Sequence, residues 1–173
     1  MPRQPSFVYS IEWPIMKHAI RKLAFVFGAA SIFLSGIALA ADGPGLTRDK
    51  VAAWLEGYEE AWETLDADKA AALFTEGATY RDNPYADPYQ GRQGIREYWT
   101  TVTSDQRDVE FSYEVLSVSG NTGIAHWHSE FTQESSGSGV VLDGIFVLEF
   151  TPEGLCQSLK EWWHLQVSPA GEK

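Results

Sequence analysis

The spacing of the apolar residues in this chain changes once, after residue 102, and that change limits the folds available to it. Between residues 51 and 65 apolar side chains recur every three or four positions, opposite a row of glutamates, as in an amphipathic helix. From residue 109 onward they alternate instead, as in strands. Turn-rich breaks divide this part into four strand-like runs, at 109–119, 123–134, 139–151 and 155–167. Helices followed by strands with short connections predict an α+β fold with a mostly antiparallel sheet.

Two further helices are predicted ahead of the four long strands. Asp66 begins a short helix over residues 69–74, which Gly77 ends, and another helix spans residues 92–102. Residues 78–82 between them are expected to form a short strand. Three N-terminal helices would then cover one face of a long curved sheet and leave a concave pocket. Their aromatic stripes would face the sheet: Trp54, Tyr58, Trp62, Tyr98 and Trp99.

Residues 1–40 have the plan of an N-terminal extension followed by a secretory signal peptide. A basic stretch at 16–22 precedes 17 uncharged, mostly apolar residues, and Ala38 and Ala40 place small residues at the cleavage site. We therefore expect a true start at Met16, cleavage after Ala40 and a periplasmic or secreted protein. A retained membrane anchor is the alternative. Beyond it we expect a flexible lead-in at 41–46, one domain at 47–167 and a tail at 168–173.

The charge of the chain excludes one class of partner. The formal net charge is −11, and residues 41–173 alone carry 9 basic and 23 acidic side chains, a net of −14. A nucleic-acid-binding protein needs a basic surface that displaces counterions, so we expect no nucleic acid partner, and no membrane partner after cleavage. The lone cysteine, Cys156, excludes an intrachain disulfide framework.

Several motifs occur in an order that resembles the SnoaL-like domains of the nuclear transport factor 2-like superfamily, relatives of ketosteroid isomerase and scytalone dehydratase. They are the aromatic stripe of the first helix, ALFTEGATYRDNP at 72–84, GRQGIREYW at 91–99 and FTPEG at 150–154. The run KEWWH at 160–164 is similar to a bacterial subset of these domains. The resemblance covers about residues 51–166 and implies a cone-shaped fold. It does not imply one activity, because the superfamily includes enzymes and binding domains.

The resemblance suggests Tyr58 and Asp82 as catalytic residues. In ketosteroid isomerases a tyrosine of the first helix and a strand aspartate before proline have the same separation, 24 residues. There the aspartate removes a C–H proton and the phenol stabilises the enolate oxygen. A core tyrosine and a turn aspartate are the structural alternatives. The isomerase also has a protonated aspartate in the third long strand. Phe146 occupies that position here, and Asp143 would need a bulge to point inward.

His126 and His128 are further catalytic candidates. Together with Glu130 they share one strand face, which is the pocket face by ungapped comparison with the isomerase. Alternation favours the opposite arrangement, because Trp127 and Phe131 are the apolar residues of this strand. Two imidazoles facing a pocket could relay protons or, with a third ligand that the sequence does not reveal, bind a metal ion. We expect no metal ion and no cofactor.

The remaining candidates are lining and interface residues. In the last strand Glu161 and Trp163 are expected to face inward, and Trp162 to face outward. Aromatic residues on an outer sheet face are typical of interfaces, and family members often dimerise there. The predicted dimer interface comprises Trp127, Trp162 and His164. The predicted ligand pocket comprises Trp62, Tyr80, Tyr98, Asp143, Phe146, Leu148, Glu161 and Trp163.

These observations favour an exported small-molecule-binding domain, possessing an apolar pocket with a few polar groups and forming a homodimer. If the protein is an enzyme, a cofactor-independent isomerase or lyase is expected, with dehydration and cyclisation as neighbouring reactions. The alternative is a non-catalytic ligand-binding or dimeric assembly domain. The sequence contains no phosphate-binding glycine loop and no Gly-x-Ser-x-Gly nucleophile motif, so nucleophilic catalysis has no support.

Overall fold

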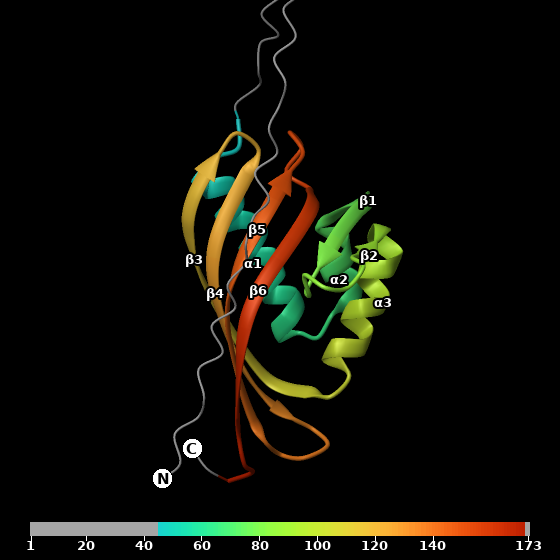
Figure 1. Ribbon diagram of the computed structural model, residues 1–173, viewed down its shortest axis with the longest axis vertical. Coiled ribbons are helices and arrows are strands. Elements are labelled where there is room, and N and C mark those ends of the chain that lie inside the picture. The colour runs from blue at the N-terminus through green and yellow to red at the C-terminus, as the bar shows by residue number, and fades with distance from the viewer. Residues whose placement is uncertain (1–44, 172–173) are drawn as a thin grey trace, which may run out of the picture. The chain divides into compact units, whose positions relative to one another are not determined.

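The computed structural model describes residues 45–171, and the predicted extension and signal peptide lie outside them. The described chain is a mixed α+β fold, which confirms the predicted class. Its single sheet has six strands, is strongly curved and does not close into a barrel (Figure 1). The elements are α1 (Arg48–Glu63), α2 (Ala67–Ala72), β1 (Phe74–Arg81), β2 (Tyr89–Gln90), α3 (Gly91–Thr103), β3 (Gln106–Ser119), β4 (Thr122–Gln133), β5 (Gly139–Phe150) and β6 (Cys156–Ser168).

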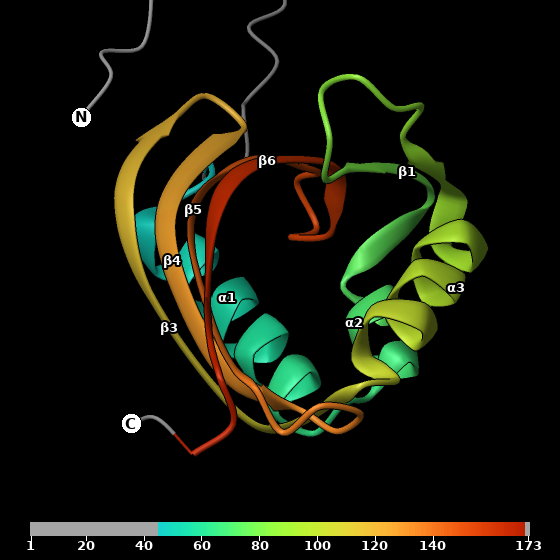
Figure 2. The same cartoon turned by 60° about the horizontal axis from the view of Figure 1, so that its bottom comes forward.

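The sheet order is β2-β1-β6-β5-β4-β3, and all pairs are antiparallel except β1 with β6. Strands β3 to β6 form the meander that the short connections predict. Strand β1 is added beside β6 and comes from between the helices, so β6 occupies the middle of the sheet. Figure 2 shows α1 within the curve of β3–β6, with α2 and α3 beside it on the β1 side.

The first helix follows its sequence pattern closely. The Thr47 hydroxyl accepts a hydrogen bond from the Lys50 amide (3.3 Å) and caps the helix. Burial then recurs at the predicted spacing, which brings one aromatic stripe into the core. The buried residues of α1 are Val51, Trp54, Leu55, Tyr58, Ala61 and Trp62. None of the helices between residues 45 and 171 is long and apolar enough to span a bilayer.

The second helix has the predicted length but lies two residues earlier in the chain than predicted. It ends at Ala72, and β1 begins at Phe74, so residues 74–77 are extended where a helix end was expected. Tertiary pairing explains the difference, because Phe74 pairs with Cys156 of β6 and the Cys156 amide donates to the Leu73 carbonyl (3.0 Å).

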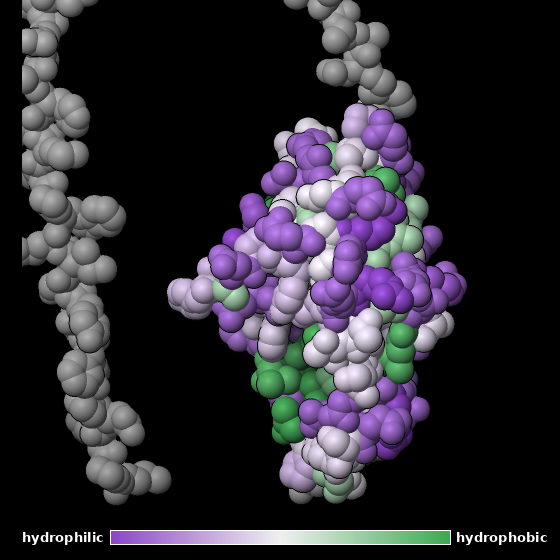
Figure 3. Space-filling model, turned by 90° about the vertical axis from the view of Figure 1, so that its right-hand side faces the viewer, coloured by the Kyte–Doolittle hydropathy of each residue, from purple (hydrophilic) through white to green (hydrophobic). Residues whose placement is uncertain are grey.

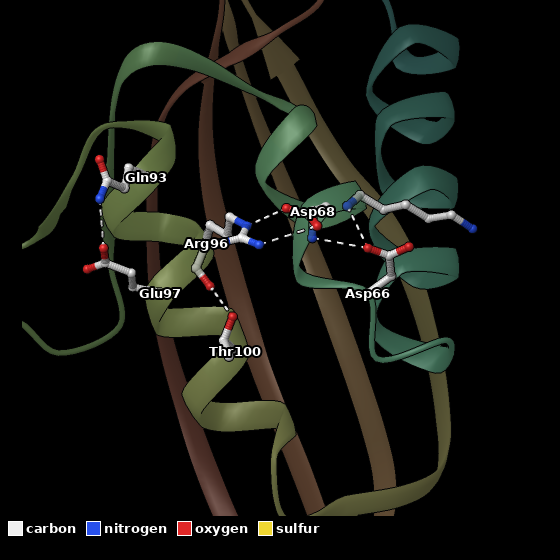
Figure 4. Close-up of polar contacts among 7 residues, drawn as sticks. Asp66, Asp68, Gln93, Arg96, Glu97 and Thr100 are labelled. Atoms are coloured by element: carbon white, nitrogen blue, oxygen red, sulfur yellow. Dashed lines mark hydrogen bonds and ion pairs between the residues drawn. The ribbon is translucent and has the colours of Figure 1, made fainter.

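A cap begins α2, and an ion pair connects α2 to α3. Asp66 caps α2 by accepting from the amides of Asp68 and Lys69, at 3.0 and 2.9 Å. The Arg96 guanidinium of α3 forms an ion pair with Asp68 of α2 (Figure 4). Both side chains are exposed, so this pair positions the helices more than it stabilises them.

Gly144 lets the indole of Trp127 lie directly against β5. A Cβ atom there would come within 2.7 Å of the Trp162 carbonyl oxygen and 2.9 Å of the Trp127 ring. We expect Gly144→Ala to lower the free energy of unfolding by about 1–3 kcal/mol, because neither neighbour has room to move. Urea denaturation measures this change. Gly139→Ala is the matched control, since its Cβ meets nothing closer than 4.0 Å. Equal stability of the two variants would contradict the prediction.

Candidate functional site

A cavity of about 310 Å³ lies between the helices and the inner face of the sheet. We call it the inner cavity. Its wall combines aromatic, aliphatic and a few polar side chains from several helices and strands. The lining residues are Tyr58, Trp62, Tyr80, Tyr98, Trp99, Val102, Gln106, Trp127, Phe131, Gln133, Val140, Leu142, Glu161, Trp163, Leu165 and Val167.

The most buried polar groups of the inner cavity form one hydrogen-bonded chain. The Tyr80 hydroxyl donates to Oε1 of Glu161 (3.0 Å), and the hydroxyls of Tyr58 and Tyr80 are 2.9 Å apart. Tyr80 uses its only proton toward Glu161, so Tyr58 is the donor in the second bond. All three side chains are buried, and the Glu161 residue is 5% exposed. Helix α1 and strands β1 and β6 thus meet at a single polar cluster.

Burial changes the acid–base chemistry of this cluster. Desolvation, opposed by the Tyr80 hydrogen bond and assisted by the charge of Asp82, raises the pKa of Glu161 to about 8. Desolvation, with the Glu161 charge as the second cause, also raises the pKa values of Tyr58, Tyr80 and Tyr98 above their ordinary value. At neutral pH the cavity therefore contains a largely protonated carboxylic acid beside neutral phenols.

The rest of the inner cavity is mostly apolar, and the cavity opens to solvent. Gln106, one of its few polar residues, accepts the indole N–H of Trp62 (2.8 Å). At the mouth, Trp163, Leu165 and Val167 of β6 are 42%, 56% and 52% exposed. Figure 3 shows apolar surface gathered on the lower half of the face that includes α3. Exposed apolar side chains around a cavity are typical of a site for an apolar molecule.

Asp82 lies outside the inner cavity but close to its polar end. It follows β1 directly, is half-buried and lines a second concavity of about 480 Å³ together with Glu161 and Trp163. We call this concavity the outer groove. Glu161 and Trp163 line both the inner cavity and the outer groove, so the two concavities adjoin at β6. The charge of Asp82 also contributes to the raised pKa of Tyr98, which agrees with this position.

The two histidines of β4 belong to the outer sheet face. Nε2 of His126 lies 3.0 Å from Oδ2 of Asp143, and Nδ1 of His128 lies 3.3 Å from the same oxygen. Nε2 of His128 is 3.1 Å from Oε1 of Glu130. Hydrogen bonds to Glu130 and Asp143 raise the pKa of His128, and the His126 hydrogen bond lowers that of Asp143. All four side chains are partly exposed, so this cluster is a solvated network.

The expectation that His126 and His128 face the pocket is therefore wrong, and so is the assignment of Trp127 to a dimer interface. Trp127 is 1% exposed and stacks on Phe146 with ring centroids 5.1 Å apart. Because side chains alternate along β4, an inward Trp127 requires outward histidines. The alternation of apolar residues predicted this correctly, and the ungapped comparison did not. Asp143 also faces outward, beside His126, and so lies in the outer groove instead of the ligand pocket.

The other predicted lining residues divide into two groups. Phe146 and Leu148 are fully buried in the core and do not line the inner cavity. Five do line it: Trp62, Tyr80, Tyr98, Glu161 and Trp163. Trp162 and His164 are exposed on the outer face, and their role in dimerisation stays a prediction. Among residues 45–171, no set of three or more His, Cys, Asp or Glu side chains is arranged to hold a metal ion.

The sequence prediction placed Glu161 in the pocket without its raised pKa, and it missed Trp99, Val102 and Gln106 in the wall. A signal for Glu161 was present. It is the one charged residue on a face of β6 that otherwise carries Leu159, Trp163, Leu165 and Val167. Helix α3 offered the same kind of signal, since Trp99 and Val102 continue the stripe that contains Tyr98.

Comparison with known proteins identifies similar domains. The family model of the SnoaL-like domain matches residues 55–158. The steroid Delta-isomerase of Nocardioides simplex is 28% identical over 103 residues, which cover 58% of this chain and 80% of the isomerase.

Solved structures with similar folds were also found. SalBIII, an epoxide hydrolase/cyclase-like enzyme in pyran ring formation of the polyether salinomycin, is 25% identical with a TM-score of 0.60. That match covers 69% of this chain and 96% of SalBIII. The Mycobacterium tuberculosis protein Rv0760c is 13% identical with a TM-score of 0.62, covering 71% and 99% of the two chains, and shows the fold alone.

Proposed function

Because the chain belongs to the SnoaL-like domain family, we propose that it is a cofactor-free isomerase of a small apolar ketone bound in the inner cavity. The observation that carries this proposal is the chain from Tyr58 through Tyr80 to Glu161 at the buried end of an otherwise apolar cavity. Similarity to a steroid Delta-isomerase supports the reaction type, and similarity to SalBIII, an epoxide hydrolase/cyclase-like enzyme, supports an enzymatic role for this fold.

The proposed reaction moves one proton and needs no co-reactant. A carboxylate removes a proton from the carbon between the carbonyl group and a β,γ double bond, and the electron pair moves onto the carbonyl oxygen. Hydrogen bonds from the polar cluster stabilise that oxygen in the dienolate. The same carboxyl group then returns the proton to the γ carbon, which leaves a conjugated ketone of unchanged composition.

Asp82 is the proposed base. It is half-buried, reaches solvent through the outer groove and lies close enough to Glu161 to raise its pKa. Glu161 lines both concavities, so it is the residue at which the inner cavity and the groove containing Asp82 adjoin. Two neighbouring carboxyl groups, one buried with a raised pKa and one open to solvent, are typical of acid–base sites.

We expect Asp82→Asn to lower kcat for a β,γ-unsaturated ketosteroid about 10²–10⁴-fold, since it removes the proton-accepting group. The ultraviolet absorbance of the conjugated product measures turnover. Asp87→Asn, on the same loop but exposed and outside both concavities, is the matched control and should retain wild-type activity. Absence of turnover by the wild-type protein, for this ketosteroid and for smaller β,γ-unsaturated ketones, would refute the proposed function.

A dimeric assembly domain is the second candidate. Trp162, 51% exposed on the outer face and close to His164, supports this alternative, because isomerisation in the inner cavity makes no use of it. We also propose export to the periplasm, on the signal-like sequence of residues 16–40. The mass of the protein in solution tests whether it forms a dimer. Fractionation of the cells that produce it tests whether it is exported.

A further inference from the structure

The inner cavity has polar side chains at both of its ends. The polar cluster that includes Glu161 lies at one end, and Gln106 and Gln133 line the other. In the sheet Glu161 lies in the same row as Ala125 of β4, and Gln133 follows eight residues further along that strand (133 − 125 = 8). Gln106 pairs directly with Gln133, so the two side chains leave the sheet side by side. A molecule that reaches both ends must therefore be elongated.

The wall between the two polar ends is apolar. Trp127 and Phe131 of β4, Leu142 of β5 and Trp163 and Leu165 of β6 line it. Their register places them between the rows of the sheet that contain the polar ends. A molecule that fills the inner cavity would place apolar atoms along this wall and polar atoms only at its two ends.

Gln106 has a buried NH2 group that is free to bind a ligand. The residue is 9% exposed, and its Oε1 accepts the indole N–H of Trp62 (2.8 Å), which can only donate and so fixes the orientation of the amide. Nε2 has no hydrogen-bond partner among residues 45–171. It is also absent from the fully enclosed atoms that lack a partner there, such as Nε1 of Trp99. Nε2 therefore borders open space, and that space is the inner cavity.

Gln133 presents the same kind of group beside it. Its Oε1 accepts the hydroxyl of Ser136 (3.1 Å), and that hydroxyl accepts the amide of Ser138 (3.2 Å). Both glutamines that line the inner cavity thus have engaged oxygens, and neither NH2 group has a partner in the described part of the chain. The side chains at this end can donate hydrogen bonds to a ligand but have no oxygen left to accept one.

We infer that Gln106 is a specificity-determining residue whose NH2 group donates a hydrogen bond to the far end of the ligand. The preferred substrate is then an elongated ketone with a second carbonyl or ether oxygen at the end opposite the reacting carbonyl. This inference rests on the proposed function for the reacting ketone, but recognition of the second oxygen can be measured by binding alone. A ligand that lacks this oxygen displaces water from the amide without replacing its hydrogen bond, and therefore binds more weakly.

The test compares two conjugated ketones that differ by one oxygen, androst-4-ene-3,17-dione and androst-4-en-3-one. Quenching of tryptophan fluorescence follows their binding. Wild-type protein should bind the dione about tenfold more tightly than the monoketone, since one buried donor is otherwise left unpaired. Gln106→Leu keeps a similar volume without the donor and should lose this preference. Gln157→Leu, exposed on β6 and outside both concavities, is the matched control and should retain it.

A second measurement needs no variant. In nuclear magnetic resonance spectra of the wild type, the side-chain NH2 signals of Gln106, assigned through its own backbone, should shift with the dione and stay in place with the monoketone. A purely structural role for Gln106 would instead weaken the binding of both ligands equally in Gln106→Leu. That result, equal binding of the two ligands by the wild type, unmoved NH2 signals, or no binding of either ligand would each overturn the inference.

Kinetics separate this inference from the proposed function. Gln106→Leu should raise KM for a β,γ-unsaturated 3,17-diketone about tenfold and leave kcat unchanged, because a contact far from the reacting carbons is the same in the bound substrate and in the transition state. A Gln106-dependent preference for the dione without turnover by the wild type would support the recognition and refute the isomerase. Turnover without that preference would refute the recognition alone.

Discussion

Replacing Trp127 by alanine is expected to lower the free energy of unfolding by about 3–5 kcal/mol. The indole is 1% exposed, and its centroid lies 5.1 Å from that of Phe146, 5.7 Å from Trp62 and 6.2 Å from Phe111. Removing it leaves a cavity beneath β4, bounded by rings that cannot collapse into the space. The midpoint of urea denaturation at constant slope measures the loss.

The neighbouring histidines provide the control for this prediction. His126→Ala with His128→Ala removes two imidazoles from the same strand but from its solvated face, where each pairs with partly exposed carboxylates. We expect the double variant to lose no more than about 1 kcal/mol. A larger loss for the histidine pair than for Trp127→Ala would mean that the two faces of β4 are exchanged.

Glu161→Gln is expected to stabilise the protein at alkaline pH by up to roughly 5 kcal/mol relative to the wild type. The folded protein holds the pKa of Glu161 at about 8, against an ordinary value of 4.5. Between these values the folded state binds more protons than the unfolded state, so the stability of the wild type falls as the pH rises from about 4.5 to about 8. The glutamine side chain of the variant cannot titrate, so the variant loses none of this stability over the same range.

Urea denaturation at about pH 5 and about pH 8 measures both proteins under the same conditions. The other carboxyl groups titrate in both, so the difference between the two pH profiles isolates Glu161. We expect the profiles to lie close together at about pH 5 and to separate toward about pH 8. Parallel profiles would show that Glu161 has an ordinary pKa in the folded protein, and would also remove a neutral donor from the polar cluster of the proposed reaction.

The candidate site was only partly predictable from the sequence. The 24-residue separation of Tyr58 and Asp82 predicts both as site residues, and the structure brings each of them close to Glu161 from a different side. The resemblance implied a second acid at the position of Phe146, where the chain has none. The register of β5 with β6 places Glu161 directly across from Phe146, on the same inner face. No local sequence pattern predicts this pairing, because the two residues lie on different strands.

The placement of His126 and His128 illustrates the reverse case. The alternation of apolar residues along β4 predicted the correct orientation of the strand, because burying Trp127 releases far more free energy than burying an imidazole. The ungapped comparison with ketosteroid isomerase assigned the residues of β4 to the wrong faces. A shift of one residue in such an alignment exchanges the two faces of a strand. The solvated cluster with Asp143 is therefore a result of burying Trp127 in the core.

The sequence by itself determined the order and type of the main elements and the apolar face of α1, because the periods of helix and strand are properties of the backbone over a few residues. Only the tertiary structure decided that β1 pairs in parallel with β6, that α2 ends at Ala72, and that Tyr80 meets Glu161 across 81 positions of sequence. Contacts at such separations depend on how the sheet curves around the helices. The raised pKa of Glu161 follows from that enclosure, since desolvation depends on the whole surrounding structure and not on the residue itself.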